Sequence, residues 1–170
     1  MLKRDEILKY FSELNDILRK DSQLGEIGIV GGAAMCLVYK SRASTRDVDA
    51  IFEPSSVIRD AAARVGTKYK LPKDWLNDGA KGFLAENFKR EVFLNLSNLS
   101  VWAPETSYML AMKCISARWD SLDKDDVIFL MNQLKIKTAE EVFQLIESYY
   151  PKNLIPPKTQ FFIEEILSNR

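Results

Sequence analysis

Apolar residues recur at helical spacing near both ends of the chain. Between Lys3 and Arg19 they fall three or four positions apart, which places them on one face of an amphipathic helix. Further helices are predicted over residues 104–119, 123–134, 139–149 and 158–168. The second part of the chain is therefore expected to be helical.

The middle of the chain is typical of strands joined by turns. A first strand is expected to begin at Gly28–Val30, and a short apolar run, Ala33–Tyr39, follows a glycine pair. Residues Asp47–Phe52 alternate between polar and apolar side chains, as in a strand with one buried face. Glu91–Trp102 is expected to form a hairpin that turns at Asn98.

A helix is expected to link these strands. Pro54 stops the second strand, and Ser55 or Ser56 would cap a helix that runs through Ala63. Such a helix crosses over the sheet and returns the chain. The 170 residues suit a single domain with one core, so strands and helices together predict an α/β (α+β) fold over residues 1–170.

Charge and hydropathy narrow the possible environments. The formal net charge is zero, so no bulk field attracts nucleic acid or a membrane surface. No apolar run approaches membrane-spanning length, and the N-terminal residues include acidic side chains and lack the apolar core of a signal peptide. Residence in the cytoplasm, with no membrane partner, is the default expectation.

The absence of histidine narrows the possible chemistry. A chain with no histidine has no Ser-His-Asp or Cys-His catalysis of the usual form and no histidine-bound zinc. Cys36 and Cys114 each lie in an apolar helical pattern, so both are expected to be buried free thiols. Phosphoryl chemistry with carboxylates, a metal and basic groups needs no histidine and stays open.

The strand at Asp47–Phe52 carries the sharpest chemical pattern. Side chains alternate along a strand, so Asp47 and Asp49 share one face, whereas Val48 and Ala50 share the other and can be buried. Two adjacent carboxylates repel each other unless positive charge lies between them. A hard cation such as Mg²⁺ suits one or two carboxylates together with phosphate oxygens, so this face is a candidate metal site.

The glycine pair that precedes this strand fits the same hypothesis. Gly31 and Gly32 have no Cβ atom, so their backbone can approach a ligand closely or turn sharply. If Ala33–Tyr39 is a helix, its first N–H groups favour phosphate. A Gly-Gly pair also occurs in ordinary strand–helix turns, and Asp-x-Asp also occurs on the solvated face of an edge strand. The pattern alone therefore leaves both a ligand site and a purely structural role open.

Taken in order, these residues resemble a known family. A Gly-Gly pair opening a helix and a strand with Asp-x-Asp is similar to the nucleotidyltransferase superfamily, with its polymerase-beta-like fold. The narrower likeness is to small bacterial nucleotidyltransferases related to abortive-infection toxins, which show Gly-Gly-x-Ala and then Arg-x-Thr-x-Asp-x-Asp. The matching residues are Gly31, Gly32, Ala34, Arg42, Thr45, Asp47 and Asp49, with Ser44 as a small insertion.

Two later segments extend the resemblance. Leu71–Asp78 is similar to a Leu-Pro-x-Asp-Trp-Leu-Asn-Asp element of the same group; Trp75 is expected to fill a packing corner, and Asn77 and Lys81 are candidates for the acceptor side of a site. The residues from Ala103 to Arg118, followed by Asp123 and Asp126, are similar to its Pro-Glu…Leu-Ala-x-Lys-x-x-Ala-x-Arg helix and Asp-x-x-Asp.

The resemblance implies a fold and a set of site residues. The fold is a small mixed β-sheet flanked by helices, with an α/β core over 1–103 and a helical part over 104–170 packed on it. A third carboxylate often comes from a later strand, where Glu91 is the only acidic candidate. The implied roles are catalysis for Asp47, Asp49 and Lys113, nucleotide binding for Gly31, Gly32, Arg42, Thr45 and Asp126, and Mg²⁺ or Mn²⁺ binding for Asp47 and Asp49.

Several alternatives stay open at this level. Lys113 either faces nucleotide phosphates or forms a structural ion pair with Asp126, and the two are compatible. The implied activity is transfer of an NMP from an NTP to a protein, RNA or small-molecule acceptor. The alternative is a catalytically weak nucleotide-binding module in a toxin–antitoxin or phage-defence pair, with an antitoxin-like partner. A nucleic-acid binder that uses scattered lysines ranks last, because such lysines usually form a solvated face.

Overall fold

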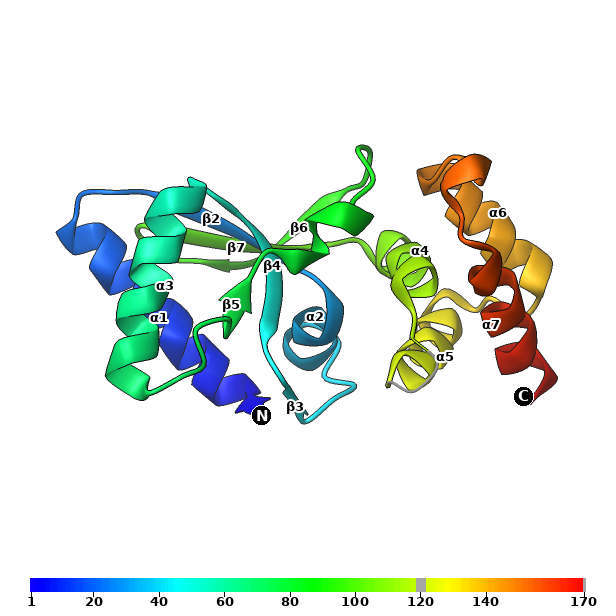
Figure 1. Ribbon diagram of the computed structural model, residues 1–170, viewed down its shortest axis with the longest axis horizontal. Helices are drawn as coiled ribbons and strands as arrows, with labels where there is room; N and C mark the ends of the chain where they lie inside the picture. Colours follow the sequence, from blue (N-terminus) through cyan, green and yellow to red (C-terminus); the bar gives the residue numbers. More distant parts are fainter. Residues whose placement is uncertain (119–121, 170) are drawn as a thin grey trace. The chain divides into compact units, whose positions relative to one another are not determined.

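The computed structural model describes residues 1–118 and 122–169, and the chain divides into two compact units (Figure 1). Residues Met1–Gly82 and Arg90–Ala103 form the first, here called the sheet unit. Residues Phe83–Lys89 and Pro104–Arg170 form the second, here called the helical unit. The fold is mixed α and β, which confirms the predicted class.

The sheet unit is built on a five-stranded mixed sheet of order β5-β4-β2-β7-β6. Strand β2 lies at its centre, antiparallel to β4 and parallel to β7, and β4 is parallel to β5. The strands are β2 (Gly25–Ile29), β4 (Val48–Glu53), β5 (Leu76–Asn77), β6 (Arg90–Asn95) and β7 (Leu99–Pro104). The β6–β7 pair, with Asn98 in the connection between its strands, confirms the predicted hairpin.

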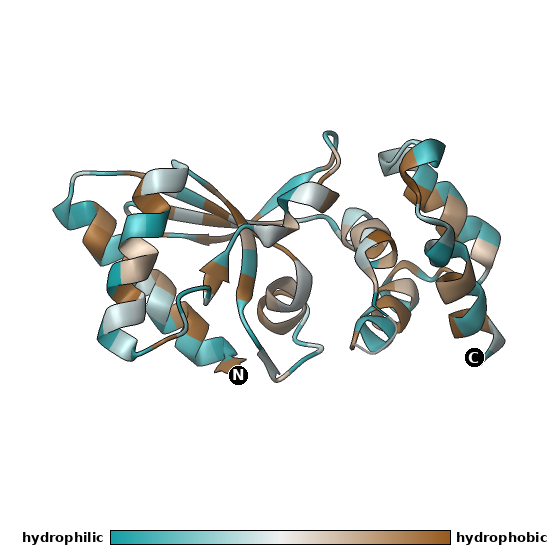
Figure 2. Cartoon of the chain, viewed as in Figure 1, coloured by the Kyte–Doolittle hydropathy of each residue, from teal (hydrophilic) through white to brown (hydrophobic). Residues whose placement is uncertain are grey.

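Two long helices lie side by side and bury their apolar residues in one core with those of the sheet (Figure 1). Helix α1 (Arg4–Lys20) places apolar and polar residues on different sides, as Figure 2 shows, and buries Ile7, Phe11 and Leu14. Helix α3 (Ser55–Tyr69) contributes further core residues. The periodicity that predicted the first helix is therefore explained by burial of its apolar face.

The alternation along β4 is confirmed. Val48, Ala50 and Phe52 are buried in the core shared with α1 and α3, whereas Asp49 and Ile51, between them, are only partly buried. A strand with one face on a core produces this pattern because successive side chains point to opposite faces. Asp49 accordingly lies on the face opposite the apolar core.

Some boundaries differ from the predictions. Helix α3 starts at Ser55 with Pro54 at the N-cap position, and it continues to Tyr69 instead of ending at Ala63, because Val65 and Gly66 also face the core. Pro104 is the last residue of β7, and helix α4 starts two residues later. The end of the predicted 104–119 helix, Trp119, lies outside the described residues.

One small sheet was not predicted at all. Strand β1 (Leu2–Lys3) pairs antiparallel with β3 (Ser44–Thr45), so that Leu2 lies opposite Thr45 and Lys3 opposite Ser44. The connection that precedes β4 is thereby fastened to the start of α1. The short helix α2 (Gly31–Leu37) precedes it and buries Ala33 and Leu37 in the same core.

The helical unit contains four of the described α-helices. These are α4 (Thr106–Ser116), α5 (Asp123–Leu134), α6 (Ala139–Tyr149) and α7 (Pro157–Ser168), together with the 3-10 segment η2 (Lys152–Leu154). A second 3-10 segment, η1 (Gly79–Phe83), ends the Met1–Gly82 part of the sheet unit. The predicted capping box opens α6: the Glu141 N–H donates to Thr138 Oγ1 at 3.2 Å, and the Thr138 N–H donates to Glu141 Oε2 at 2.9 Å.

Tyrosine hydroxyls fasten the Phe83–Lys89 segment to these helices. The Ala85 N–H donates to the Tyr108 hydroxyl at 2.8 Å, and the Tyr150 hydroxyl donates to the Phe83 carbonyl at 2.6 Å. The Phe88 ring stacks on Tyr108 with centroids 4.1 Å apart. Burial raises the pKa of both phenols, so both stay protonated; the Tyr150 hydroxyl donates and the Tyr108 hydroxyl accepts.

The remaining predictions from composition can also be compared with the structure. Cys36 and Cys114 are both buried free thiols, as expected. Among the residues that the structure describes, no helix combines the length and the apolarity needed to cross a membrane.

Candidate functional site

The site predicted around Asp47 and Asp49 lies where β2 ends and β4 begins. Ile29 pairs with Ala50, and the Val30 N–H donates to the Asp49 carbonyl at 3.0 Å. This register places the residues that follow β2, which are the two glycines, beside the first residues of β4. Asp47 comes directly before β4, and both carboxylate residues are partly exposed.

Gly31 lies against the Asp49 carboxylate. Its φ of +57° is in the left-handed region, where a residue with a Cβ atom is strained. A Cβ built on Gly31 would lie 3.1 Å from Asp49 Oδ2 and 3.6 Å from Asp49 Cβ. Glycine is required here both for the backbone conformation and for the close approach of the carboxylate.

Gly32 makes an equally close approach to the connection before β4. A Cβ on Gly32 would lie 2.6 Å from Thr45 Oγ1 and 3.4 Å from Arg42 Nη1. Thr45 is buried and is held in place by the β1–β3 pairing. The fold therefore brings Gly31, Gly32, Arg42, Thr45 and Asp49 together, although their chemical roles stay predictions.

Glu91, the acidic candidate for a third carboxylate, lies far from Asp49 in the order of the strands. Glu91 lies on β6, at the far edge of the sheet, and β2 and β7 separate that strand from β4. The neighbour of β4 on its other side is β5, where Asn77 is the register partner of Asp49. Parallel partners on adjacent strands point to the same face, so the side chain beside Asp49 on β5 is an amide.

The Asn77 side chain makes two hydrogen bonds to nearby backbone groups. Its Oδ1 accepts from the Gly79 N–H at 3.0 Å, and its Nδ2 donates to the Asp74 carbonyl at 3.3 Å. The neighbouring Asp78 is engaged by Lys81 at 2.9 Å and Arg59 at 2.6 Å, and these cations lower the pKa of its carboxyl. The Trp-Leu-Asn element in the sequence indicated Asn77 as a candidate site residue. The position of Asn77 beside Asp49 was not predicted.

Trp75 has the packing role that was expected. Its side chain is buried against the edge of Tyr10, with ring centroids 5.5 Å apart, and its indole N–H donates to the Ala62 carbonyl at 3.0 Å. The indole thus joins the β5 segment to α3 and α1. The backbone carbonyl of Trp75 also accepts from the Val48 N–H at 2.7 Å, which aligns β5 with the start of β4.

Lys113 and Asp126 belong to the helical unit and form a buried ion pair. Lys113 Nζ lies 2.7 Å from Asp126 Oδ2 and 2.8 Å from Asp123 Oδ1, and the lysine side chain is only 7% exposed. Asp123 Oδ2 also accepts from the Arg118 N–H at 3.1 Å. The structural ion pair is confirmed, with Asp123 as a further member, and contact with phosphate stays a prediction.

Asp47 and Asp49 do not belong to a larger group of metal-ligating side chains in the described part of the chain. Within residues 1–118 and 122–169, no three or more His, Cys, Asp or Glu side chains gather in a way that would hold a metal ion. Mg²⁺ requires fewer protein ligands than that when phosphate oxygens complete its coordination. The oxygen donors of Asp47 and Asp49 therefore fit a metal that arrives with a polyphosphate, and they do not fit a closed protein-only metal site.

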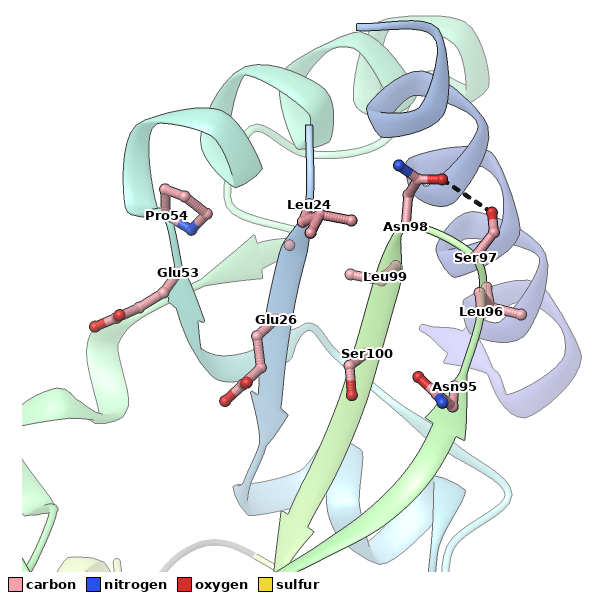
Figure 3. Close-up of a pocket in the computed structure, with 11 residues that line it drawn as sticks. Leu24, Glu26, Glu53, Pro54, Asn95, Leu96, Ser97, Asn98, Leu99 and Ser100 are labelled. Atoms are coloured by element: carbon pink, nitrogen blue, oxygen red, sulfur yellow. Dashed lines mark hydrogen bonds between the residues drawn. The ribbon is translucent and has the colours of Figure 1, made fainter. Parts of the chain in front are cut away.

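A hollow of about 570 Å³ lies at the other end of the sheet (Figure 3). Glu26 and Glu53, which are register partners, line it together with residues 95–100 of the hairpin. Glu26 Oε1 accepts from the Trp102 indole at 2.6 Å and from Arg90 at 3.1 Å. None of the predicted site residues lines this hollow, so it is separate from the glycine–aspartate cluster.

Comparison with known protein families identifies the family of the chain that carries these site residues. A family model described as nucleotidyltransferase of unknown function (DUF6036) matches residues 5–150. The chain belongs to this family. No curated protein and no solved structure matches the chain.

The match to this nucleotidyltransferase family extends over both units. It includes the glycine pair, Asp47 and Asp49 in the sheet unit, and Lys113 and Asp126 in the helical unit. The superfamily inferred from the Gly-Gly and Asp-x-Asp pattern is thereby confirmed. The family description names the class of transferase and leaves the acceptor and the metal open.

Proposed function

We propose that this nucleotidyltransferase family member transfers an NMP from an NTP to an acceptor, at the cluster formed by Gly31, Gly32, Arg42, Thr45, Asp47 and Asp49. The observation that carries the proposal is the contact geometry of the glycines. A Cβ on Gly31 would meet the Asp49 carboxylate, and one on Gly32 would meet Arg42 and Thr45. Acidic and basic groups therefore flank one bare stretch of backbone.

The division of charge suits a nucleoside triphosphate. Asp47 and Asp49 would hold Mg²⁺, or Mn²⁺ in its place, which supplies charge neutralisation at the polyphosphate when it is bound. The bare backbone at Gly31 and Gly32 allows phosphate oxygens to approach, and Arg42 offers fixed positive charge with bidentate geometry. The acceptor would be a protein, an RNA or a small molecule.

The double variant Asp47→Asn, Asp49→Asn tests the proposal. It removes both negative charges with little change in shape, so Mg²⁺-dependent NTP binding measured by calorimetry should fall below detection. Asp60→Asn, an exposed carboxylate on α3, is the matched control and should bind as the unmodified protein does. Nucleotide binding that survives in the double variant would overturn the assignment of these carboxylates.

A second candidate is a catalytically weak nucleotide-binding module, for example one half of a toxin–antitoxin pair. Asn77 favours it, because an amide beside Asp49 cannot accept the proton of an attacking hydroxyl as a carboxylate can. Incubation with radiolabelled NTPs and cell lysate separates the two, since a transferase leaves label on an acceptor. Greater labelling by Asn77→Asp than by the unmodified protein would support the weak-enzyme reading.

A further inference from the structure

Trp102 lies on the same face of the sheet as Asp49. Residues two apart on a strand share a face, so Ile51 follows Asp49 on the side of β4 that faces away from the apolar core. Ile51 pairs with Gly28 on β2, and Gly28 pairs with Trp102 on β7. Because register partners on neighbouring strands point to the same face, these residues form one row across the face that carries the candidate site.

The indole of Trp102 is enclosed between a strand and a guanidinium. A Cβ on Gly28 would overlap three atoms of the indole, so one face of the ring lies directly on the backbone of β2. The guanidinium carbon of Arg90 lies 4.4 Å from the centre of the ring, over the face that β2 leaves open. Trp102 is consequently only 5% exposed. The Gly28 backbone, the Trp102 indole and the Arg90 guanidinium together are here called the Arg90 stack.

One carboxylate holds the two upper layers of the Arg90 stack in position. Glu26 Oε1 accepts from the Trp102 indole N–H at 2.6 Å and from Arg90 Nη1 at 3.1 Å. The Arg90 side chain nevertheless stays 59% exposed, and its guanidinium has no other ionic or hydrogen-bonded partner within the described residues. The stack therefore presents a planar cation to solvent, and an exposed guanidinium plane is a surface on which nucleobases stack.

The Arg90 stack and the bare backbone at Gly31 lie on opposite sides of Asp49. The Asp49 carbonyl accepts from the N–H of Val30, so Gly31 comes just after this point of the chain and Gly28 just before it. Two residues along β4 and one strand across separate Asp49 from Gly28, which corresponds to about 8 Å between their Cα atoms at ordinary strand spacings. A ribose with its base spans a comparable distance.

We propose that the nucleobase of the NTP stacks on the guanidinium of Arg90, which Glu26 holds over Trp102. The inference rests on the proposed function and adds a subsite for the base to it. With the metal held by the paired carboxylates and the phosphates at the glycine pair, the sugar and the base extend along β2 toward Gly28. Stacking uses the π face that every nucleobase has, so this subsite contributes affinity for all four NTPs.

Arg90→Gln tests the subsite by calorimetry with Mg²⁺ and, in turn, ATP, GTP, CTP and UTP. The tightest-binding NTP should bind roughly 5-fold or more weakly, as expected for loss of one stacking partner. Inorganic tripolyphosphate, which has no base, should bind within about 2-fold of the unmodified protein, because the lost charge is exposed and screened. Arg59→Gln is the matched control: Arg59 also lies over an aromatic ring, Phe52, and pairs with a carboxylate, but it belongs to α3 and should leave NTP binding unchanged.

Arg90→Lys separates stacking from charge. It keeps the positive charge beside Glu26 and removes the planar group, so NTP binding should again weaken several-fold. Urea denaturation checks that both variants are folded. NTP affinity equal to that of the unmodified protein in either folded variant overturns the inference, and so does a loss of tripolyphosphate affinity as large as the loss of NTP affinity.

Two further measurements identify the source of the base and judge the reaction. If a single-stranded oligonucleotide binds Arg90→Gln more weakly while NTP binding is unchanged, the stack serves the acceptor and the inference is overturned. An unmodified protein that binds every NTP no more tightly than tripolyphosphate also overturns it. Label transfer from NTP tests the proposed function separately: base-dependent binding through Arg90 without any transfer supports the subsite and contradicts the transferase.

Discussion

Gly31 shows how strongly the candidate site depends on a missing side chain. Its left-handed backbone turns the chain from β2 into α2, and the space that a Cβ would fill lies 3.1 Å from Asp49 Oδ2. Any other residue would add backbone strain and displace the carboxylate. Conformation and chemistry therefore require the same residue at this position.

Gly31→Ala should accordingly lower the free energy of unfolding by about 1–2 kcal/mol, because alanine is strained at positive φ. It should also weaken Mg²⁺-dependent NTP binding by moving Asp49. Gly82→Ala is the matched control, since a Cβ there meets nothing within 4 Å, and its effect should stay within about 0.5 kcal/mol. Urea denaturation of both variants measures the difference, and equal losses would contradict the strain at Gly31.

Cys114 illustrates the effect of complete burial on a single thiol. Desolvation raises its pKa from the ordinary 9.0 to about 12 in the folded protein. The unfolded thiol therefore loses its proton at a lower pH than the folded one. The stability that this group contributes is complete below pH 9 and is lost as the pH rises toward about 12.

The free energy of unfolding should thus fall between pH 9 and 11 more steeply in the unmodified protein than in Cys114→Ala. The expected difference in slope is roughly 1 kcal/mol per pH unit. Chemical denaturation at a series of pH values gives both slopes. Parallel slopes would show that the thiol titrates normally in the folded state.

At the scale of elements, the Lys113 cluster joins α4 to the first turn of α5. The lysine donates to Asp123 and is paired with Asp126, and Asp123 in turn accepts from the Arg118 backbone. Acidic side chains in the first turn also suit the positive end of the helix. This cluster explains a lysine on an otherwise apolar, buried helix without reference to a ligand.

Lys113→Met should lower the free energy of unfolding by roughly 3–5 kcal/mol, because it leaves buried carboxylates without their cation. Lys124→Met is the control: its partner Glu165 lies 3.5 Å away, both side chains are about half exposed, and the loss should be below about 1 kcal/mol. Thermal or urea unfolding measures both. A Lys113 variant as stable as the control would favour a role outside the ion pair.

At the scale of the molecule, each unit has its own buried core. Phe11, Ile29 and Phe52 belong to the core of the sheet unit, whereas Leu130 and Ile146 are buried in the helical unit. Separate cores allow separate local stabilities. The Phe83–Lys89 segment counts with the helices because Tyr108 and Tyr150 hold it there.

Leu130→Ala should therefore speed amide hydrogen exchange in α4 to α7 and leave the amides of β2, β4 and β7 protected. Phe11→Ala should give the opposite pattern, since each substitution opens a cavity in one core only, at a cost of about 2–5 kcal/mol. Native-state exchange read by mass spectrometry distinguishes the units. Equal acceleration throughout the chain by either variant would show a single cooperative unit.

Much of the local structure could be predicted from the residues. Burial of Val48 and Ala50 with Asp49 on the opposite face follows from the alternation of side chains along a strand. The capping box at Thr138 and Glu141, the bounds of α5 and α6, and the buried thiols likewise agree with the predictions. Each of these features is set by neighbours a few residues apart, whose chemistry is visible in the sequence.

The order of the strands and the long-range contacts emerged only when the chain was folded. Glu91 lies on the strand at the far edge of the sheet, Asn77 is the register partner of Asp49, and the start of the chain pairs with Ser44 and Thr45. Side-chain periodicity reports which face of an element is buried, but it does not report which element comes to lie beside it. That choice depends on how the whole core packs, so the companions of Asp49 were decided in three dimensions.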